Sequence, residues 1–261
     1  MRLDMYLADR RSMTRSRAKA LIEKGSVSVD GKTVTKPAFD ISEETSPSIE
    51  VDEDALPYVS RGGLKLRGAL DEFKIDVAGR VCADIGASTG GFTDCLIKSG
   101  AAKVYAVDSG SDQLAESLRR DARVVSMEHF NARELTSDSF GELCSLAVAD
   151  LSFISQTLVL DAVASILEDG GEYIGLIKPQ FECGRSALGK GGIVRDASEH
   201  LRAVERVTLC ATECGFTVKS VISSPIFGGD GNREFLFHAI KSGETAQCLL
   251  TRTELKRLVA K

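Results

Sequence analysis

The sequence predicts an α/β fold, with a largely parallel sheet covered by helices on both faces, preceded by a small α+β unit. From Val81 onward, short apolar runs alternate with segments of helical periodicity, the pattern of parallel strands joined by crossover helices. Before residue 38, two short helical patterns lead into an alternating valine segment. A length of 261 residues accommodates such a pair of units.

The first unit is expected over residues 1–37. Apolar side chains recur at helical spacing in residues 3–7 and 18–22. Ser12 or Thr14 is expected to cap the second helix, and Gly25 to end it. The segment VSVDGKTV, residues 27–34, predicts a hairpin that turns at Asp30-Gly31.

Charge is distributed unevenly over this end of the chain. Residues 1–37 carry nine basic and four acidic side chains, whereas residues 38–57 carry seven acids and no base. Pro37, Pro47 and Pro57 mark the second stretch as an extended connector with one short strand at 48–51. The basic cluster suits phosphate groups, although a solvated surface explains the charge equally well.

The second unit follows, as alternating strands and helices. Strands are expected at 81–86, 103–108, 123–128, 145–153, 172–179, 216–225 and 233–241. Helices are expected after a capping Ser60 and at 94–100, 111–120, 156–171 and 197–215, with a short one in the tail. The last two strands could form an antiparallel hairpin.

Composition indicates a globular protein without membrane spans. No apolar run approaches the roughly 18 residues of a membrane span, and the polar N-terminus is unlike a secretory signal. A cytoplasmic location is therefore expected. The seven cysteines are scattered and lack metal-ligand spacing, so we expect reduced thiols and no metal site.

The segment DIGASTGGFTD, residues 84–94, has the features of a cofactor-binding loop. Gly86, Gly90 and Gly91 would let the backbone approach a ligand, and Asp108 ends the next strand, where it could accept ribose hydroxyl groups. The glycine spacing differs from the G-x-G-x-x-G of dinucleotide sites. Asp84 would repel a pyrophosphate but suit an amino group or a sulfonium, which favours S-adenosylmethionine over NAD. A tight turn without a ligand is the simpler alternative.

Four ionisable residues are expected at one edge of the sheet. Asp150 and Lys178 each end an apolar strand, and Glu234 begins the last strand, which would reach the same edge if it runs antiparallel. Lys65 lies in the helix after Ser60. Burial and Lys65 would favour a neutral Lys178, whereas the two carboxylates would favour its charged form, so the sequence leaves the balance open. Separate surface ion pairs are the alternative.

The N-terminal unit resembles the S4 RNA-binding domain, through its R-L-D start, its S-R-x-x-A-x-x-L-I helix and G-x-V-x-V-D-G. The resemblance covers residues 2–37. It implies binding of structured RNA, with phosphate contacts from Arg2, Arg15, Arg17 and Lys19.

Residues 58–240 resemble the FtsJ-type ribose 2′-O-methyltransferases, whose Lys-Asp-Lys-Glu tetrad matches Lys65, Asp150, Lys178 and Glu234. With the S4-like unit, the whole chain resembles the TlyA or hemolysin-A family. This implies a Rossmann-like methyltransferase domain at 58–241, an RNA-binding unit at 1–57, a tail at 242–261, and methylation of cytidine in ribosomal RNA. The cofactor positions implied for S-adenosylmethionine are Asp84, Gly86, Ser88, Gly90, Gly91, Phe92, Thr93 and Asp108.

Three other functions fit the sequence less well. The family name suggests a cytolysin, but the chain has no basic amphipathic helix of useful length. An RNA-binding protein without catalysis is disfavoured by the complete tetrad, and a nicotinamide oxidoreductase by the glycine spacing. The linker Leu56-Pro57-Tyr58-Val59 lacks the Trp of better-known family members, which leaves its role open.

Overall fold

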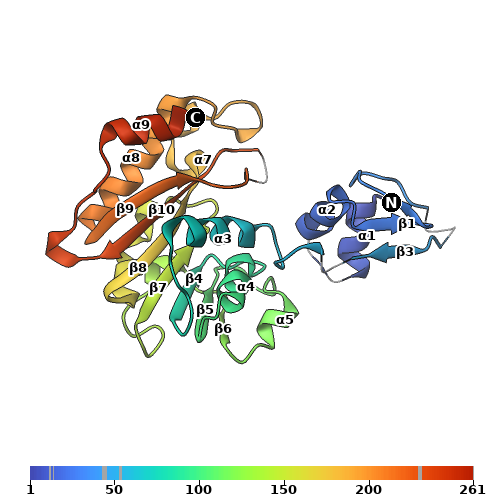
Figure 1. Ribbon diagram of the computed structural model, residues 1–261, viewed down its shortest axis with the longest axis horizontal. Helices are drawn as coiled ribbons and strands as arrows, with labels where there is room; N and C mark the ends of the chain where they lie inside the picture. Colours follow the sequence, from blue (N-terminus) through green and yellow to red (C-terminus); the bar gives the residue numbers. More distant parts are fainter. Residues whose placement is uncertain (12, 14, 43–45, 53–54, 229–230, 261) are drawn as a thin grey trace.

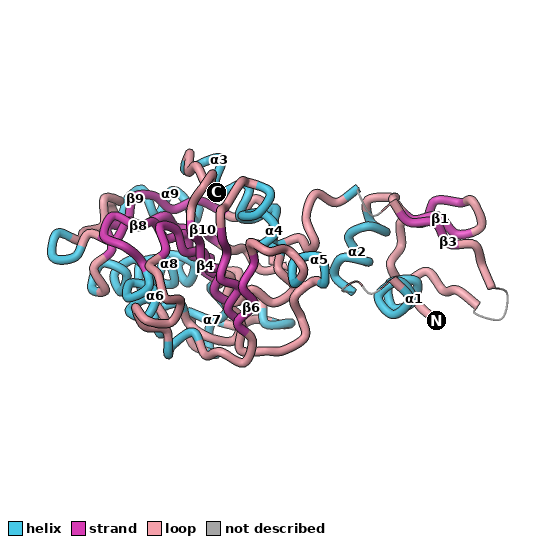
Figure 2. Tube along the Cα trace, turned by 90° about the horizontal axis from the view of Figure 1, so that it is seen from below, coloured by secondary structure: helices cyan, strands magenta, loops and turns pink. Residues whose placement is uncertain are grey.

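The chain forms a small N-terminal unit and a larger α/β unit that lie next to each other (Figures 1 and 2). This computed structural model describes residues 1–11, 13, 15–42, 46–52, 55–228 and 231–260. The predicted caps Ser12 and Thr14, and four of the seven connector acids, lie outside the described residues.

The N-terminal unit packs two helices against a three-stranded antiparallel sheet. Its elements are α1 (Leu3–Arg10), α2 (Arg15–Glu23), β1 (Val27–Val29), β2 (Lys32–Thr33) and β3 (Ile49–Val51). The predicted hairpin is confirmed, because β1 pairs with β2 and the turn residues Asp30 and Gly31 have φ of 50° and 74°. Positive φ at both positions gives the turn the twist that short hairpins need.

The larger unit is built on a seven-stranded sheet. Its strands are β4 (Val81–Ile85), β5 (Lys103–Val107), β6 (Val124–Met127), β7 (Cys144–Ala149), β8 (Leu167–Ile177), β9 (Phe216–Ser223) and β10 (Phe235–Lys241). The order is β6-β5-β4-β7-β8-β10-β9. The first five strands of that order are parallel, and β10 runs antiparallel to both of its neighbours, which is the arrangement that Glu234 requires to reach the edge formed by Asp150 and Lys178.

Helices cover both faces of this sheet (Figure 1). They are α3 (Gly62–Phe73), α4 (Gly91–Lys98), α5 (Glu116–Arg119), α6 (Leu160–Ile166), α7 (Pro179–Glu182), α8 (Ala197–Glu213) and α9 (Arg252–Ala260). One core contains side chains of α3 and α4, the other those of α6, α8 and α9. Since β4 has β5 on one side and β7 on the other, the strand order reverses there, and ligands bind α/β sheets at such points.

Two local predictions are wrong. Ser60 does not cap α3, which begins at Gly62 with no side-chain cap bond. The helix predicted at 156–171 is short, because α6 ends at Ile166 and β8 begins at Leu167. Gly170 has φ of 80°, and such a conformation, which glycine permits, is incompatible with a continuing helix. Among the described residues, no helix is long and apolar enough to cross a bilayer.

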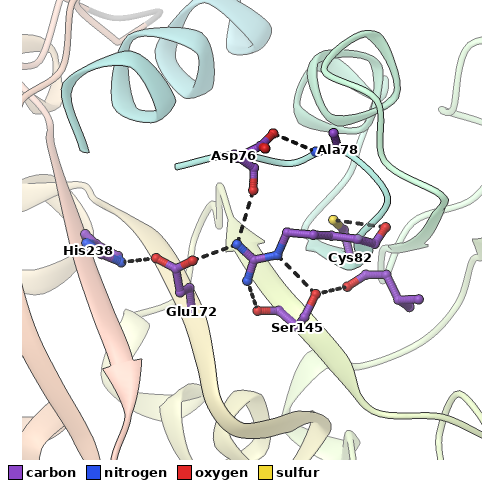
Figure 3. Close-up of polar contacts among 8 residues, drawn as sticks. Asp76, Ala78, Cys82, Ser145, Glu172 and His238 are labelled. Atoms are coloured by element: carbon purple, nitrogen blue, oxygen red, sulfur yellow. Dashed lines mark hydrogen bonds and ion pairs between the residues drawn. The ribbon is translucent and has the colours of Figure 1, made fainter. Parts of the chain in front are cut away.

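A half-buried ionic network (Figure 3) connects β7, β8, β10 and the residue before β4, at the end of the sheet opposite the carboxyl ends of the parallel strands. The guanidinium of Arg80, just before β4, donates to Oε1 of Glu172 in β8 at 2.6 Å. It also donates to the Ser145 hydroxyl in β7. Glu172 also contacts Nε2 of His238, on β10, at 2.6 Å. The hydrogen bonds to His238 and then Arg80 lower the pKa of Glu172 to about 2, against the effect of burial.

Candidate active site

Three of the four tetrad positions lie at strand ends on one edge of the sheet. Asp150 directly follows β7, and Lys178 directly follows β8. Glu234 directly precedes β10, and the pairing of Phe235 with Ile177 places it beside Lys178. Lys65 reaches the same edge from α3, which packs over that end of the sheet.

The four side chains form one continuous chain of ion pairs. Nζ of Lys178 lies 2.6 Å from Oδ1 of Asp150, and Nζ of Lys65 lies 2.6 Å from Oε2 of Glu234. Lys65 and Asp150 are 3.8 Å apart and join the two pairs. Both lysines and Glu234 are buried. Two ammonium groups and two carboxylates balance in charge, which makes the burial of either lysine tolerable.

Ser152 is a fifth polar residue at this edge, which sequence reasoning missed. Nζ of Lys178 donates to Oγ of Ser152 at 2.9 Å. Both side chains line a cavity of about 300 Å³ together with Lys65, Asp150 and the turn before α3. The available signal was the position of Ser152, two residues after Asp150 in the turn that leaves β7.

A second cavity of about 480 Å³ continues from the first, since Gly86, Ser88, Asp150 and Ser152 line both. Asp108 lies on its wall and accepts the backbone N–H groups of Ser88 and Gly110, at 2.8 and 2.7 Å. Asn131 lies on the same wall. At Gly86 a Cβ would come within 3.0 Å of the Asp150 carbonyl oxygen, and φ is 83°. A side chain there would therefore strain the junction of the two cavities.

The remaining predicted cofactor positions divide into two groups. Gly91 and Phe92 line the first cavity. Asp84, Gly90 and Thr93 are buried and line neither cavity. Thr93 donates to Oδ2 of Asp84 at 2.6 Å, while Oδ1 of Asp84 has no hydrogen-bond partner among the described residues. Burial raises the pKa of Asp84 to about 7. Asp84, Gly90 and Thr93 therefore stabilise the loop from the protein interior and do not face the cavities.

A buried network that the sequence did not predict connects the loop after Asp150 to the helix after Lys178. Glu182, at the end of α7, accepts the hydroxyl of Ser155 and the backbone N–H of Gln156. Burial raises the pKa of this carboxyl. Gln156 in turn donates to the carbonyl of Leu176 in β8.

In the described part of the chain, no cluster of three His, Cys, Asp or Glu residues could hold a metal ion.

The four predicted RNA contacts lie on the N-terminal unit, where three are half-exposed. Arg2 and Arg15 both bind the buried carboxylate of Asp4, at 2.9 and 3.0 Å, and Arg2 is the larger cause of the lowered pKa of Asp4. Lys19 pairs with Glu23 at 3.7 Å. Arg17 differs, since it donates to the backbone carbonyl of Tyr58. It thereby connects the N-terminal unit to the start of the α/β unit.

Comparisons with known proteins agree with this architecture. Residues 58–241 match the FtsJ-like methyltransferase family, and residues 1–45 match the S4 domain. The chain belongs to the FtsJ-like methyltransferase family. Within that family it is 46% identical, over 90% of this chain and 87% of the relative, to the 16S/23S rRNA (cytidine-2′-O)-methyltransferase TlyA of Mycobacterium tuberculosis.

Two further relatives place this FtsJ-like chain in the TlyA/hemolysin A group. Hemolysin A of Brachyspira hyodysenteriae is 44% identical, over 92% of this chain and all of the relative. A solved structure of a protein described as a hemolysin from Streptococcus thermophilus covers 100% of this chain and 94% of its own, at 43% identity and a TM-score of 0.80. Both domains are therefore shared with relatives of nearly equal length.

Proposed function

We propose that this chain transfers a methyl group from S-adenosylmethionine to the ribose 2′-hydroxyl of a cytidine in ribosomal RNA. The observation that carries the proposal is the chain of ion pairs that joins Lys65, Asp150, Lys178 and Glu234, the first three of which line a cavity that continues into the second cavity. Family membership supports methyl transfer, and the name of the mycobacterial relative supports cytidine and ribosomal RNA.

The second cavity suits the adenosine part of the cofactor. Asp108 offers carboxylate oxygens to ribose hydroxyls, and Asn131 offers an amide on the same wall. Gly86 at the junction lets the chain of the ligand pass toward Lys178. When bound, S-adenosylmethionine supplies an electrophilic methyl group on its sulfonium. We assign Ser88, Gly91 and Phe92 to the same binding site, with Asp84, Gly90 and Thr93 supporting its loop.

Lys178 is the proposed general base. In the resting site its ammonium group donates to Asp150 and Ser152. After one proton is lost to solvent, the neutral amine can keep both hydrogen bonds and offer its lone pair to a third partner in the cavity. The 2′-hydroxyl gives its proton to Nζ while its oxygen bonds to the methyl carbon, and the bond from that carbon to sulfur breaks. Asp150 orients the amine, Lys65 pairs with Asp150, and Glu234 holds Lys65. Holding the reacting atoms in line supplies much of the acceleration.

The N-terminal unit, residues 1–57, is proposed to capture the RNA, and residues 58–241 to carry the chemistry. Arg2, Arg15 and Lys19 keep about half of their side-chain surface exposed, at 46, 57 and 50%, and can approach phosphates. On the α/β unit, Phe153 lies beside the second cavity with 92% of its surface exposed. We propose that an unstacked nucleotide enters between the N-terminal unit and Phe153. We place the enzyme in the cytoplasm with its substrate.

Labelling of isolated ribosomal subunits tests the proposal. The purified protein is incubated with methyl-labelled donor and either small or large subunits, and the modified ribose is mapped. We expect label on a cytidine 2′-oxygen in at least one subunit. No label in either subunit, from protein that binds the donor, would refute it.

The names of two relatives suggest membrane lysis as a second candidate. Liposome leakage with the purified protein tests this function directly. Robust leakage at low protein concentration would support it, whereas intact liposomes together with methylated RNA would leave methyl transfer as the activity.

A further inference from the structure

The residues Asn232-Arg233-Glu234 send three consecutive side chains into three different parts of the protein. Oδ1 of Asn232, which is buried, accepts the backbone N–H of Val194, and its amide donates to the carbonyl of Gly192. Glu234 pairs with Lys65 of α3. Arg233 points elsewhere, to the C-terminal end of α9.

Arg233 closes the last turn of α9. Its guanidinium donates to the carbonyl oxygens of Leu258 and Val259, at 2.8 and 2.7 Å, and to the Ser223 hydroxyl on β9 at 2.8 Å. The last carbonyls of a helix lack partners within it and carry partial negative charge, so a cation is favourable there. A helix of nine residues is marginal alone, and α9 is held by this contact and by the buried Leu255 and Val259.

The extended backbone makes this contact relevant to catalysis. Successive side chains of an extended chain point to opposite faces. The Arg233 guanidinium stacks over the Phe235 ring, 5.0 Å from its centre, and Phe235 belongs to the core shared with α8 and α9. Glu234 therefore faces the other side, toward α3. Its carbonyl accepts the backbone N–H of Ser224 at 2.9 Å, and a Cβ on Gly228 would lie 2.5 Å from its Oε1.

We infer that Arg233, anchored by the C-terminal end of α9, is a positioning residue for Glu234, so that the tail helix belongs to the catalytic assembly. Figure 1 shows α9 beside α8 and close to the start of β10. The inference rests on the proposed function, in which Glu234 holds Lys65. Loss of the guanidinium would let the turn before β10 shift and move Glu234 away from Lys65. A displacement of about 1 Å in a catalytic group can reduce turnover about 10²-fold.

Arg233→Ala in the full-length chain tests the inference, with Arg252→Ala as the matched control. Arg252 also lies on α9, but its ion pair with Glu205 is exposed at the other end of the helix. We expect Arg233→Ala to lower kcat about 10²-fold, with KM for ribosomal RNA and the affinity for S-adenosylhomocysteine unchanged. Guanidinium ions at millimolar concentration should restore part of kcat. The control should behave as wild type.

Hydrogen exchange gives a readout that does not depend on methyl transfer. Exchange of the Ser224 amide, which is bonded to the Glu234 carbonyl, should accelerate in Arg233→Ala and not in the control. Unchanged kcat, unchanged exchange at Ser224, or a lower kcat that follows only a general loss of folding would each overturn the inference. An inactive wild type would refute the proposed function instead, and exchange at Ser224 would still decide the role of Arg233.

Discussion

The network of Arg80, Glu172 and His238 gives a stability prediction whose size follows from the structure (Figure 3). Glu172→Gln keeps the shape of the side chain but removes the charge that faces Arg80 and His238. An ordinary glutamate has a pKa of 4.5, and Glu172 has a pKa of about 2. At about 1.4 kcal/mol for each pH unit, this difference corresponds to about 3 kcal/mol of folding free energy at neutral pH.

The pH dependence fixes the sign of this contribution. Because the pKa of Glu172 is lowered in the folded state, its stabilisation is complete above the unfolded value and is lost as pH falls from about 4.5 to 2. Glu172→Gln should therefore reduce the free energy of unfolding by about 3 kcal/mol at pH 7 and by less than half of that at about pH 3.

Urea unfolding followed by circular dichroism measures the effect, since the chain has no tryptophan to report by fluorescence. Glu116→Gln is the control, because its pair with Arg120 is exposed, and it should cost no more than about 0.5 kcal/mol. A loss below about 1 kcal/mol for Glu172→Gln at pH 7, or an equal loss at pH 3 and pH 7, would refute the reasoning.

Three other predictions concern the site. Because the pKa of Asp84 is raised to about 7, the free energy of unfolding should fall as pH rises from about 4 through 7. In urea titrations, Asp84→Asn should remove this dependence on pH. The same dependence in Asp84→Asn as in the wild type would contradict the assignment. Phe153→Ala should raise KM for ribosomal RNA about 10-fold or more, because base stacking is lost. Leu209→Ala is the control: it also truncates an exposed apolar side chain, on α8, and should leave this KM unchanged. Because the Ser152 hydroxyl orients Lys178, Ser152→Ala should lower kcat and Ser152→Thr should recover part of it. Equal kcat for the wild type and both variants would remove Ser152 from the mechanism.

The sequence was most informative where a single backbone pattern decides the structure. Alternating valines around Asp30-Gly31 specify a hairpin, and strands that end in Asp150 and Lys178 specify an edge of the sheet. An antiparallel last strand was the condition for Glu234 to reach that edge, and β10 meets this condition.

Side-chain partners from distant segments could not be predicted in the same way. Glu182 holds Ser155 only because α7 folds back onto the loop after β7. The binding of Arg2 and Arg15 to Asp4 depends on how α1 packs against α2. The end of α6 at Ile166 was also missed, because the helical apolar pattern continues into Leu167 and only the glycine pair interrupts it.

The central claim is that the buried amine of Lys178, held by Asp150, takes the proton of the 2′-hydroxyl. Lys178→Met tests this claim most directly. Single-turnover methyl transfer to ribosomal subunits and calorimetric binding of S-adenosylhomocysteine are measured on the same preparation, with Lys219→Met, an exposed substitution on β9, as the control. We predict unchanged cofactor affinity and a methyl-transfer rate lower by at least about 10²-fold, as for loss of a general base. A Lys178→Met protein that transfers methyl groups at the wild-type rate would contradict the account.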